Sequence, residues 1–498
     1  MAETRMLSFI HVEQDYPQKR KAKARAQDFD EISQTYLLAK AEEQASRCSQ
    51  CGVPFCQVHC PLQNHIPDWL KLAAEGRLQE AYQLSNATSN MPEICGRICP
   101  QDRLCEGNCV IEQSGHGSVT IGSIEKYITD TAWKEGWVEP LLPVADRSGQ
   151  SVGIIGAGPA GLSAAEQLRV RGYEVHVYDR HDRAGGLLTY GIPGFKLEKP
   201  VVMRRVERLE AGGIHFHMNV EVGTDLSFAA LRERHDAVLI ATGVYKARAA
   251  GVAGSGLKGV VPALSYLIAS NRKGFGDAVP DYDSGVLNAA GRHVVVVGGG
   301  DTAMDCVRTA VRQGAASVTC MYRRDRANMP GSQREVANAG EEGVAFRWLA
   351  APLAFEGAAV GDEAGQVRSV RAVAMRLGAA DASGRRAPEP EPGSDFTLPA
   401  DLVVNALGFD PEDLVDDWEA GELAVTRWGT VRTDPRTLAT NLPGVFAAGD
   451  IVRGASLVVW AIREGRDVAD AMHAWLKARV SGDKVRSDEK LRGERKAA

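Results

Sequence analysis

The sequence lacks the segments that would place it in a membrane or send it out of the cell. No apolar run approaches the length of a membrane-spanning helix, and Met1–Arg5 contains no apolar stretch that could act as a secretory signal. We therefore expect a cytoplasmic protein, in which a reducing environment disfavours structural disulfides. The formal net charge of −6 gives no general reason to expect a nucleic-acid partner.

Two arrangements of reactive cysteine are also missing. No cysteine follows Met1, so we expect no glutaminase that uses an N-terminal cysteine nucleophile. Cys306 and Cys320 lie 14 positions apart, and no CxxC pair lies near the glycine-rich motifs described below. We therefore expect no disulfide reductase of the thioredoxin type, and both side chains should be small buried hydrophobes. The 498 residues suit three domains of ordinary size, without room for a further large FMN barrel.

Eight of the 10 cysteines lie in two short clusters near the N-terminus. The clusters are Cys48-x2-Cys51-x4-Cys56-x3-Cys60-Pro61 and Cys95-x3-Cys99-Pro100 followed by Cys105-x3-Cys109. Both contain the Cys-x3-Cys-Pro ending of bacterial ferredoxins, in which the cysteine before the proline binds the neighbouring cluster. Structural zinc sites usually pair two CxxC knuckles, and only Cys48/Cys51 has that spacing. The pattern favours two iron–sulfur clusters with interleaved ligands, and zinc is the main alternative.

The region around these cysteines is expected to be a small α-helical domain. Apolar residues recur at helical spacing between Ile66 and Asn86, whereas strand patterns are weak. The basic residues from Lys19 to Arg25 are interpreted as a solvated helix face, and a docking surface for an acidic partner is the alternative. The segment Glu139–Gly149 contains two prolines and is predicted to link this domain to the next one.

A complete strand–glycine–helix–strand unit follows the linker. Ser151–Ile155 is predicted as a buried strand, Leu162–Arg171 as a helix and Tyr173–Asp179 as a second strand. The turn between the first strand and the helix is Gly156-Ala-Gly158-Pro-Ala-Gly161, and Asp179 lies 21 positions after its middle glycine. Such a turn lets backbone approach a pyrophosphate at the helix N-terminus, while the acid accepts hydrogen bonds from a ribose. The unit therefore predicts a site for a dinucleotide with a free ribose.

A second unit of the same kind differs at the position of the acid. The strand His293–Val297 leads into Gly298-Gly-Gly300-Asp-Thr-Ala303, and Ser317–Tyr322 is the second strand. Aligning the second strands of both units puts Tyr322 in the place of the acid, with Arg323 and Arg324 next. Loss of the carboxylate removes repulsion of a 2′-phosphate, which arginines can bind. The unit therefore favours NADP(H) over NAD, and a solvated strand end is the plainer interpretation of the arginines.

Further strand endings indicate that one nucleotide domain is inserted into another. Asp236–Gly243 and Asp401–Gly408 are predicted buried strands that end in glycine, 165 residues apart, and each closes a unit. Gly444–Asp450 is another such strand, and a helix begins soon after it, near Ser456. An aspartate at such a turn can bind ribityl hydroxyls, and a helix N-terminus can stabilise a reduced flavin. The chain is therefore expected to enter a flavin domain, form a second domain and return.

Several of these segments are similar to the FAD segments of the two-dinucleotide-binding flavoprotein family. They are Gly156–Gly161, Gly185–Leu188, Ile192–Lys196, Ala241–Gly243, Gly449–Asp450 and Ser456–Ile462. Tyr322–Gly331 resembles an NADPH-site sequence, and with the cysteine domain in front the chain resembles the family of small (beta) subunits of bacterial NADPH-dependent glutamate synthases. The resemblance covers nearly everything except the charged C-terminal tail. The same module occurs in dihydropyrimidine dehydrogenase and in a ferredoxin:NADP transhydrogenase.

The predicted architecture is an α/β fold of two nested Rossmann-like dinucleotide-binding domains, for FAD and NADPH, preceded by a small α-helical iron–sulfur domain. The predicted boundaries are 1–145 for the helical domain, 146–285 and 406–480 for the two FAD-domain segments, 286–405 for the NADPH domain, and 481–498 for the charged tail. The tail lacks apolar periodicity and is expected to fray.

The resemblance implies two [4Fe–4S] clusters in the helical domain. By position, one cluster would be held by Cys48, Cys51, Cys56 and Cys109, and the other by Cys60, Cys99, Cys105 and a fourth ligand. The fourth ligand is Glu125 or Cys95. Glu125 occupies the position of a glutamine ligand in dihydropyrimidine dehydrogenase, whereas a thiolate is the softer ligand. The positional match favours Glu125.

The resemblance also implies bound FAD and an NADPH site. The implied FAD residues are Gly156, Gly158, Pro159, Ala160, Gly161, Asp179, Arg180, Gly186, Leu187, Lys196, Thr242, Gly243, Gly449, Asp450, Ser456 and Leu457. The implied NADPH residues are Gly298, Gly299, Gly300, Asp301, Thr302, Ala303, Tyr322, Arg323 and Arg324. No catalytic acid or base is expected, because hydride transfer mainly requires stacked cofactors in a dry pocket.

The function implied by the resemblance is that of an electron-input subunit of glutamate synthase. Hydride would pass from NADPH to FAD, and single electrons would pass through the clusters to a large (alpha) subunit that makes L-glutamate from L-glutamine and 2-oxoglutarate. The protein would then work in a hetero-oligomer. The alternatives are the same module serving ferredoxin or another oxidoreductase partner, and a zinc-stabilised flavoprotein that only docks a partner.

Overall fold

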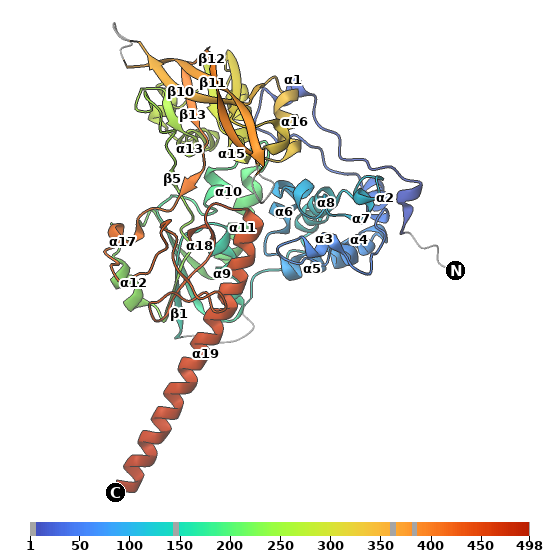
Figure 1. The fold of residues 1–498 in the computed structure, drawn as a ribbon. Coiled ribbons are helices and arrows are strands. Elements are labelled where there is room, and N and C mark those ends of the chain that lie inside the picture. Colours follow the sequence, from blue (N-terminus) through green and yellow to red (C-terminus); the bar gives the residue numbers. More distant parts are fainter. Residues whose placement is uncertain (1–5, 143–148, 359–364, 381–385, 498) are drawn as a thin grey trace.

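The structure, a computed structural model, describes residues 6–142, 149–358, 365–380 and 386–497, and the side chains as far as residue 479. Part of the predicted linker and the predicted boundary at residue 145 lie outside these residues. Figure 1 shows a helical domain beside two α/β domains, with the end of the last helix projecting away from them. The predicted α/β fold, with two nested dinucleotide-binding domains behind a helical domain, is confirmed by the arrangement of the sheets.

The helical domain consists of short helices around a small apolar core. They are α2 (Leu38–Ser46), α3 (Phe55–Val58), α4 (Ile66–Ala74), α5 (Leu78–Thr88), α6 (Pro92–Ile98), α7 (Val110–Gln113) and α8 (Ile121–Lys134), with 3-10 turns η1 (Ser8–Ile10) and η2 (Gln101–Arg103). The short helix α1 (Ala22–Arg25) lies apart from this core, against the second nucleotide domain (Figure 1). Trp69 of α4 and Ile124 of α8 are fully buried in this core. In α4 the buried Trp69, Leu70 and Ala73 share one face, as the apolar spacing predicts. The helices predicted between Ile66 and Asn86 are α4 and α5.

The first sheet contains five parallel strands in the order β15-β4-β1-β2-β3. They are β1 (Ser151–Ile155), β2 (Glu174–Asp179), β3 (Ile214–Met218), β4 (Ala237–Ile240) and β15 (Val445–Ala447). The last strand comes from far along the chain, so the chain leaves this domain after β4 and returns to it. One face of the sheet packs on α9 (Pro159–Val170), α11 (Lys199–Ala211) and α19 (Val458–Ala497) in the largest apolar core.

The second sheet repeats this plan in the order β6-β13-β7-β8-β9. Its strands are β6 (Val260–Pro262), β13 (Leu402–Asn405), β7 (His293–Val297), β8 (Ser317–Tyr322) and β9 (Ala345–Trp348). The strand β6 and the following helix α13 (Ala263–Gly274) belong to this domain, although the sequence analysis assigned 146–285 to the FAD domain. The segment that enters the domain supplies its edge strand, β6. This strand is only three residues long, so its pairing with β13 cannot be recognised from the sequence.

The remaining strands lie at the edges of the two domains. An antiparallel sheet of β10 (Ala350–Gly357), β11 (Val367–Ala380) and β12 (Arg386–Pro399) packs on the second domain. The two crossings between the domains pair with each other as β5 (Lys246–Ala247) and β14 (Phe409–Asp410). Other helices are α10 (Leu187–Tyr190), α12 (Phe228–Arg234), α14 (Pro280–Asp283), α15 (Asp301–Arg312), α16 (Gln333–Glu341), α17 (Leu414–Asp417) and α18 (Asp450–Arg453), with the 3-10 turn η3 (Arg326–Asn328).

The C-terminal tail continues the helix α19 to Ala497. In Figure 1 this end of the helix extends well beyond the α/β domains. The backbone of the tail is therefore helical, in contrast to the expectation that it frays. Among the described residues, no helix combines the length and apolar character needed to cross a membrane. Cys306 and Cys320 are fully buried in the second domain, as predicted.

Candidate cofactor and metal sites

The two glycine-rich turns have the same local construction. Gly156 has φ 109°, and a Cβ there would lie 2.3 Å from the carbonyl oxygen of Ala241 at the end of β4. Gly298 has φ 151°, and a Cβ there would lie 2.3 Å from the carbonyl oxygen of Ala406 at the end of β13. Only glycine fits this close approach of two backbones, in a conformation that L-residues avoid. The first glycine of each turn is therefore fixed by the neighbouring strand.

The middle glycine of each turn faces open space instead. A Cβ on Gly158 or Gly300 would meet no atom within 4 Å. Helices α9 and α15 begin immediately afterwards, at Pro159 and Asp301. A helix N-terminus presents unpaired N–H groups and a positive dipole end, which together suit a pyrophosphate. Both turns therefore fit the diphosphate of a dinucleotide.

One large cavity, about 660 Å³, joins the three domains. The cavity is lined by these residues of the predicted FAD set: Gly156, Gly158, Pro159, Ala160, Asp179, Leu187, Lys196, Thr242, Gly243, Gly449, Asp450, Ser456 and Leu457. Asp301 and Thr302 line it from the second nucleotide domain, and Cys99 lines it from the helical domain. Its volume is in the range of cofactor sites. The structure thus brings together residues that the sequence analysis assigned to three different cofactors.

The other residues of the predicted FAD set lie near this cavity in supporting positions. Arg180 lines an adjoining cavity of about 280 Å³ together with Asp179. Its guanidinium lies 4.7 Å above the ring of Tyr245. At Gly161 a Cβ would lie 2.0 Å from the oxygen of Gly156, so this third glycine permits close packing of helix on strand. A Cβ on Gly186 would similarly lie 2.9 Å from the Cα of Gly158.

Asp179 ends the second strand of the first unit, as a ribose-binding acid should. Its Oδ2 accepts a hydrogen bond from the backbone N–H of Ala157 at 2.8 Å. Its Oδ1 accepts from the backbone N–H of His181 at 2.9 Å. Burial raises the pKa of Asp179, but the hydrogen bonds and charge of His181 outweigh burial, and the net shift is downward. The carboxylate is therefore ionised and retains acceptor positions for a ribose hydroxyl.

Two polar groups at the cavity have unused hydrogen-bonding capacity. The hydroxyl of Thr242 is buried without a hydrogen-bond partner. Burial raises the pKa of Asp450 to about 6, against the opposing effect of a backbone hydrogen bond from Ser456. Buried polar groups are normally paired, so both fit a ligand that offers hydroxyl groups. The ribityl and ribose hydroxyls of FAD are such groups.

Sequence reasoning missed Tyr245, which also lines the cavity. Tyr245 is half-buried, and the pKa of its hydroxyl is raised by burial and by the charge of Asp179. It lies two positions after Gly243, and this closeness to a predicted site residue is the one sequence signal that could have indicated it.

The second nucleotide unit ends its second strand with Tyr322, as predicted. The phenol is buried against Gly299 and donates a hydrogen bond to the carbonyl of Asn328 at 2.9 Å. The Nε of Arg324 is buried without a partner, whereas Arg323 is exposed. Gly298, Gly299, Gly300 and Ala303 form the turn and the start of α15 beside them. An orphaned guanidinium donor at this position fits a phosphate group.

Lys196, predicted in the FAD set, is paired with the other nucleotide domain. Its Nζ lies 2.9 Å from Oδ1 of Asp305 and 3.9 Å from Oε2 of Glu335. Both acids line the large cavity, and neither was predicted. Asp305 lies four residues after Asp301 on α15, so both share one helix face, and that spacing is the sequence signal for it. Lys196 therefore connects the two nucleotide domains at the cavity.

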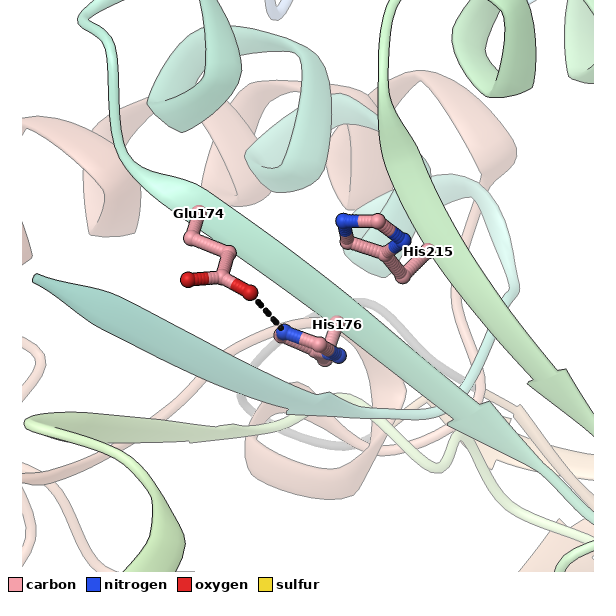
Figure 2. Close-up of side chains that lie close together, drawn as sticks. All are labelled: Glu174, His176 and His215. Carbon is pink, nitrogen blue, oxygen red and sulfur yellow. Dashed lines mark hydrogen bonds and ion pairs between the residues drawn. The ribbon is translucent and has the colours of Figure 1, made fainter. Parts of the chain in front are cut away.

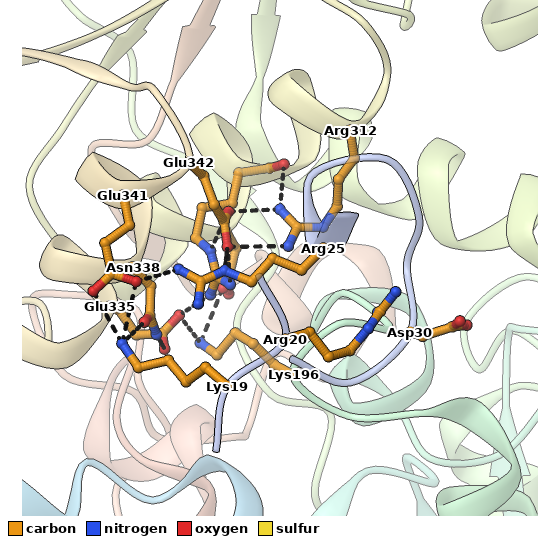
Figure 3. A network of polar contacts seen from close by, with 12 residues as sticks. Lys19, Arg20, Arg25, Asp30, Lys196, Arg312, Glu335, Asn338, Glu341 and Glu342 are labelled. Atoms are coloured by element: carbon orange, nitrogen blue, oxygen red, sulfur yellow. Dashed lines mark hydrogen bonds and ion pairs between the residues drawn. The ribbon is translucent and has the colours of Figure 1, made fainter. Parts of the chain in front are cut away.

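The basic segment near the N-terminus is part of the same network, shown in Figure 3. Arg25 is 1% exposed and donates to Glu342 at 3.0 Å, and Lys19 lies 3.1 Å from Glu341. The expectation of a solvated helix face is therefore wrong for Arg25. Spacing alone could not show this, because the acids lie more than 300 residues away.

The first predicted set of cysteines surrounds one small cavity. Cys48, Cys51, Cys56 and Cys109 all line it, although Cys109 lies 53 positions from Cys56. Burial, together with the neighbouring cysteines, raises the pKa of Cys48 to about 11 and of Cys56 to about 12. Four convergent thiols around one small cavity fit a metal centre, which binds thiolates.

One member of the second set, Cys99, lines the large cavity. Burial raises the pKa of Cys60 to about 12, and Cys95 and Glu125 are among the groups that contribute. The pKa of Cys99 is raised chiefly by its hydrogen-bonding neighbour Cys95, and that of Cys105 by burial. Cys60 and Glu125 also act on both. Glu125 is thus a neighbour of all three cysteines, and Cys95 is a neighbour of Cys60 and Cys99.

Glu125 is a buried acid without a cationic partner in its hydrogen bonds. Its Oε1 accepts from the hydroxyl of Ser85 at 3.2 Å and from the amide of Asn64 at 3.4 Å. Burial raises its pKa to about 8, in spite of the hydrogen bond from Ser85. A buried carboxyl of this kind is poised to ionise if a cation such as cluster iron is bound beside it.

Comparisons with known proteins agree with this division of the chain. Residues 25–137 match the family described as dihydropyrimidine dehydrogenase domain II, 4Fe-4S cluster, and residues 150–465 match the pyridine nucleotide-disulphide oxidoreductase family. A glutamate synthase [NADPH] small chain of Azospirillum brasilense is 65% identical over 96% of this chain and 98% of its own. The putative oxidoreductase AegA of Escherichia coli is 48% identical over 92% of this chain and 69% of its own.

A solved structure shares the fold of the two nucleotide domains. Mycobacterium tuberculosis FprA in complex with NADPH superposes with a TM-score of 0.55 at 20% identity, over 67% of this chain and 86% of that chain.

Proposed function

This chain belongs to the family of glutamate synthase [NADPH] small chains, and from that premise we propose that it is the NADPH-oxidising subunit that supplies electrons to a glutamate synthase large subunit. It is an NADPH-dependent oxidoreductase with a 4Fe-4S domain and a dinucleotide-binding flavoprotein module. When bound, FAD would accept a hydride from NADPH, and the clusters would carry electrons onward one at a time.

The observation that carries this proposal is the shared cavity. Thr242 and Asp450 of the first domain, Asp301 of the second and Cys99 of the helical domain all line it. An oxidoreductase of this type needs its hydride donor, flavin and first one-electron centre close together, in a site shielded from water. The placement of these residues supports a direct route from the second nucleotide unit to the cysteine domain.

The residues of the chain would bind and orient, without acid–base catalysis. We propose that the α9 and α15 N-termini hold the two pyrophosphates, that Asp179 and Asp450 accept hydroxyl hydrogen bonds from FAD, and that Arg323 and Arg324 bind the 2′-phosphate. Cys48, Cys51, Cys56 and Cys109 would hold one cluster, and Cys60, Cys99, Cys105 and Glu125 the other. The unpartnered Thr242 hydroxyl and Arg324 Nε support these assignments.

The test is anaerobic mixing of the purified holoprotein with NADPH. We expect bleaching of the flavin absorption and of the broad absorption near 400 nm, and reduction of an artificial one-electron acceptor. NADH should be markedly poorer as a donor. Failure of NADPH to reduce either chromophore would refute the oxidoreductase assignment.

The acceptor needs a separate experiment, because the 48% identity with a protein described as a putative oxidoreductase supports the same module with another partner. We propose a hetero-oligomer with a glutamate synthase large chain. Addition of that chain should give 2-oxoglutarate- and glutamine-dependent NADPH oxidation. Reduction of ferredoxin in place of this reaction would favour the second candidate.

A further inference from the structure

Four histidines and one glutamate occupy part of one face of the first sheet, away from the dinucleotide cavity. Glu174 and His176 lie two positions apart on β2, and His215 and His217 lie two positions apart on β3. The register pairs His176 directly with His215. Residues two apart on a strand share a face, and directly paired residues on adjacent strands are nearest neighbours. The pairing therefore gathers these side chains by backbone geometry alone.

The intervening residues on both strands face the apolar core instead. Val175, Val177 and Ile214 are buried against helices on the opposite side of the sheet. His235, in the segment between α12 and β4, completes the polar group beside β1, where a Cβ on Gly153 would lie 2.5 Å from its ring. The absence of a side chain at Gly153 leaves room for that imidazole. Nothing in the proposed electron path uses this face.

Three of these side chains converge, as Figure 2 shows. One ligand atom each from Glu174, His176 and His215 lies within 4.8 Å of the others. Nε2 of His176 lies 3.0 Å from Oε1 of Glu174, and the rings of His176 and His215 are stacked at 4.8 Å. Glu174 and His215 are exposed and His176 is half-buried, so an ion could enter from solvent.

We propose that Glu174, His176 and His215 form a binding site for a divalent transition-metal ion of the zinc type. Two imidazoles and one carboxylate are a ligand set that Zn²⁺ takes in proteins, with water in the fourth position. Imidazole also suits Ni²⁺ and Cu²⁺, whereas Mg²⁺ and Ca²⁺ prefer oxygen ligands only. The exposed side of the group leaves space for the water.

A neighbouring histidine supplies the outer hydrogen bond that metal-binding histidines require. Nδ1 of His176 lies 2.9 Å from Nε2 of His217. When Nε2 of His176 binds the metal, the ring carries its proton on Nδ1. This N–H then donates a hydrogen bond to Nε2 of His217. Such a bond fixes the tautomer and orientation of the ligand ring. His217 is thus a positioning residue and not a ligand.

The experiment is a titration of the untagged holoprotein with ZnCl₂ alone, after treatment with a mild chelator, by calorimetry at pH 7.5. Iron and flavin contents are measured before and after, so that binding at the cysteine clusters is detected as lost iron. We expect one Zn²⁺ per chain in the wild type, and loss of this binding in His176→Ala and His215→Ala. The matched control is His293→Ala, an exposed histidine on the first residue of β7 in the other sheet, which should bind as the wild type does.

Two milder variants keep the proposal testable if the histidine variants do not fold. Glu174→Gln alters an exposed side chain and should weaken binding at least about tenfold, and His217→Ala should weaken it about tenfold. Unchanged Zn²⁺ affinity in Glu174→Gln and His215→Ala would overturn the proposal. Absence of binding by the wild type at 100 μM ZnCl₂, a concentration on the order of those at which weak sites fill, would do the same. NADPH oxidation by the same chelator-treated holoprotein, before zinc is added, reports separately on the proposed function.

Discussion

Arg103 of the helical domain donates a hydrogen bond from Nη2 to Oδ2 of Asp301, the first residue of α15, at 3.2 Å. Arg103 also donates to the carbonyl of Pro330. Cys105, a predicted cluster ligand, lies two residues after Arg103. The segment that carries cluster ligands therefore contacts the helix N-terminus at which we place the NADPH pyrophosphate.

We expect Arg103→Ala to raise the KM for NADPH by about fivefold, because an exposed cation beside a phosphate contributes on the order of 1 kcal/mol. Steady-state kinetics with an artificial electron acceptor measure this KM. The iron and flavin contents of the variant should equal those of the wild type. The control is Arg77→Ala, an exposed arginine of the same domain that pairs with Glu80. An unchanged KM would show that Arg103 only joins the domains.

The double variant Arg323→Ala/Arg324→Ala should lose the preference for NADPH. Two arginines that bind a 2′-phosphate contribute charge-assisted hydrogen bonds, so KM for NADPH should rise roughly 10- to 100-fold. The KM for NADH, which lacks that phosphate, should change little. Arg376→Ala, on an exposed arginine of β11, serves as the control. Equal effects on both nucleotides would contradict the assignment.

Replacement of Glu125 should distinguish the two candidate ligands of the second cluster. If Glu125 is the ligand, Glu125→Ala should lose or alter that cluster, whereas Cys95→Ser should retain both. Iron analysis and electron paramagnetic resonance of the reduced protein measure the outcome. An intact second cluster in Glu125→Ala, with loss in Cys95→Ser, would assign the thiolate instead.

Affinity for FAD should depend on pH through Asp450. Burial raises its pKa to about 6, so the carboxyl of the flavin-free protein is mostly protonated at pH 5 and ionised at pH 7.5. Because ribityl hydroxyls donate to the ionised form, FAD should bind about tenfold more weakly at pH 5. Fluorescence titration of the flavin-free protein measures the two dissociation constants. The Asp450→Asn variant should bind FAD more weakly than the wild type at pH 7.5. Its affinity for FAD should not fall further between pH 7.5 and pH 5, because the amide does not titrate.

Glu342 should matter more for stability than its neighbour Glu341. The buried Glu342 carboxylate accepts hydrogen bonds from Arg25, Arg308 and Arg312 at 2.7–3.1 Å. Glu342→Gln leaves buried arginines without their counter-charge and should destabilise the fold by roughly 3–5 kcal/mol. Glu341→Gln, at a side chain that is 46% exposed, should cost less than about 1 kcal/mol. Calorimetric melting of both variants tests the difference.

The Glu342 carboxylate should make the stability of the fold depend on pH in the acid range. Burial opposes ionisation of Glu342, but the hydrogen bonds and charges of Arg308 and Arg312 outweigh it and hold its pKa at about 2. A lowered folded-state pKa gives stability that is present above the ordinary value of 4.5 and is lost as pH falls toward 2. Equal melting temperatures of the wild type and Glu342→Gln at pH 7 would refute this account.

The sequence by itself determined the features that depend on neighbouring residues. The glycines at 156 and 298 and the strands that precede them follow from local patterns, because strand alternation and tight turns are set within a few positions. The spacing of the cysteines likewise indicated the kind of centre, since ligand chemistry restricts that spacing. The class of the fold followed from these units and their repetition.

Only the tertiary structure decided which distant groups meet. In the folded chain Lys196 pairs with Asp305, and Arg25 is buried against Glu342. The strand β6 joins the second sheet, and Cys95 and Glu125 both lie near Cys99. It also stacked His176 on His215, through a strand register that no residue spacing records. The reason is physical: these contacts join elements whose separation along the chain leaves their relative position free until the domains pack.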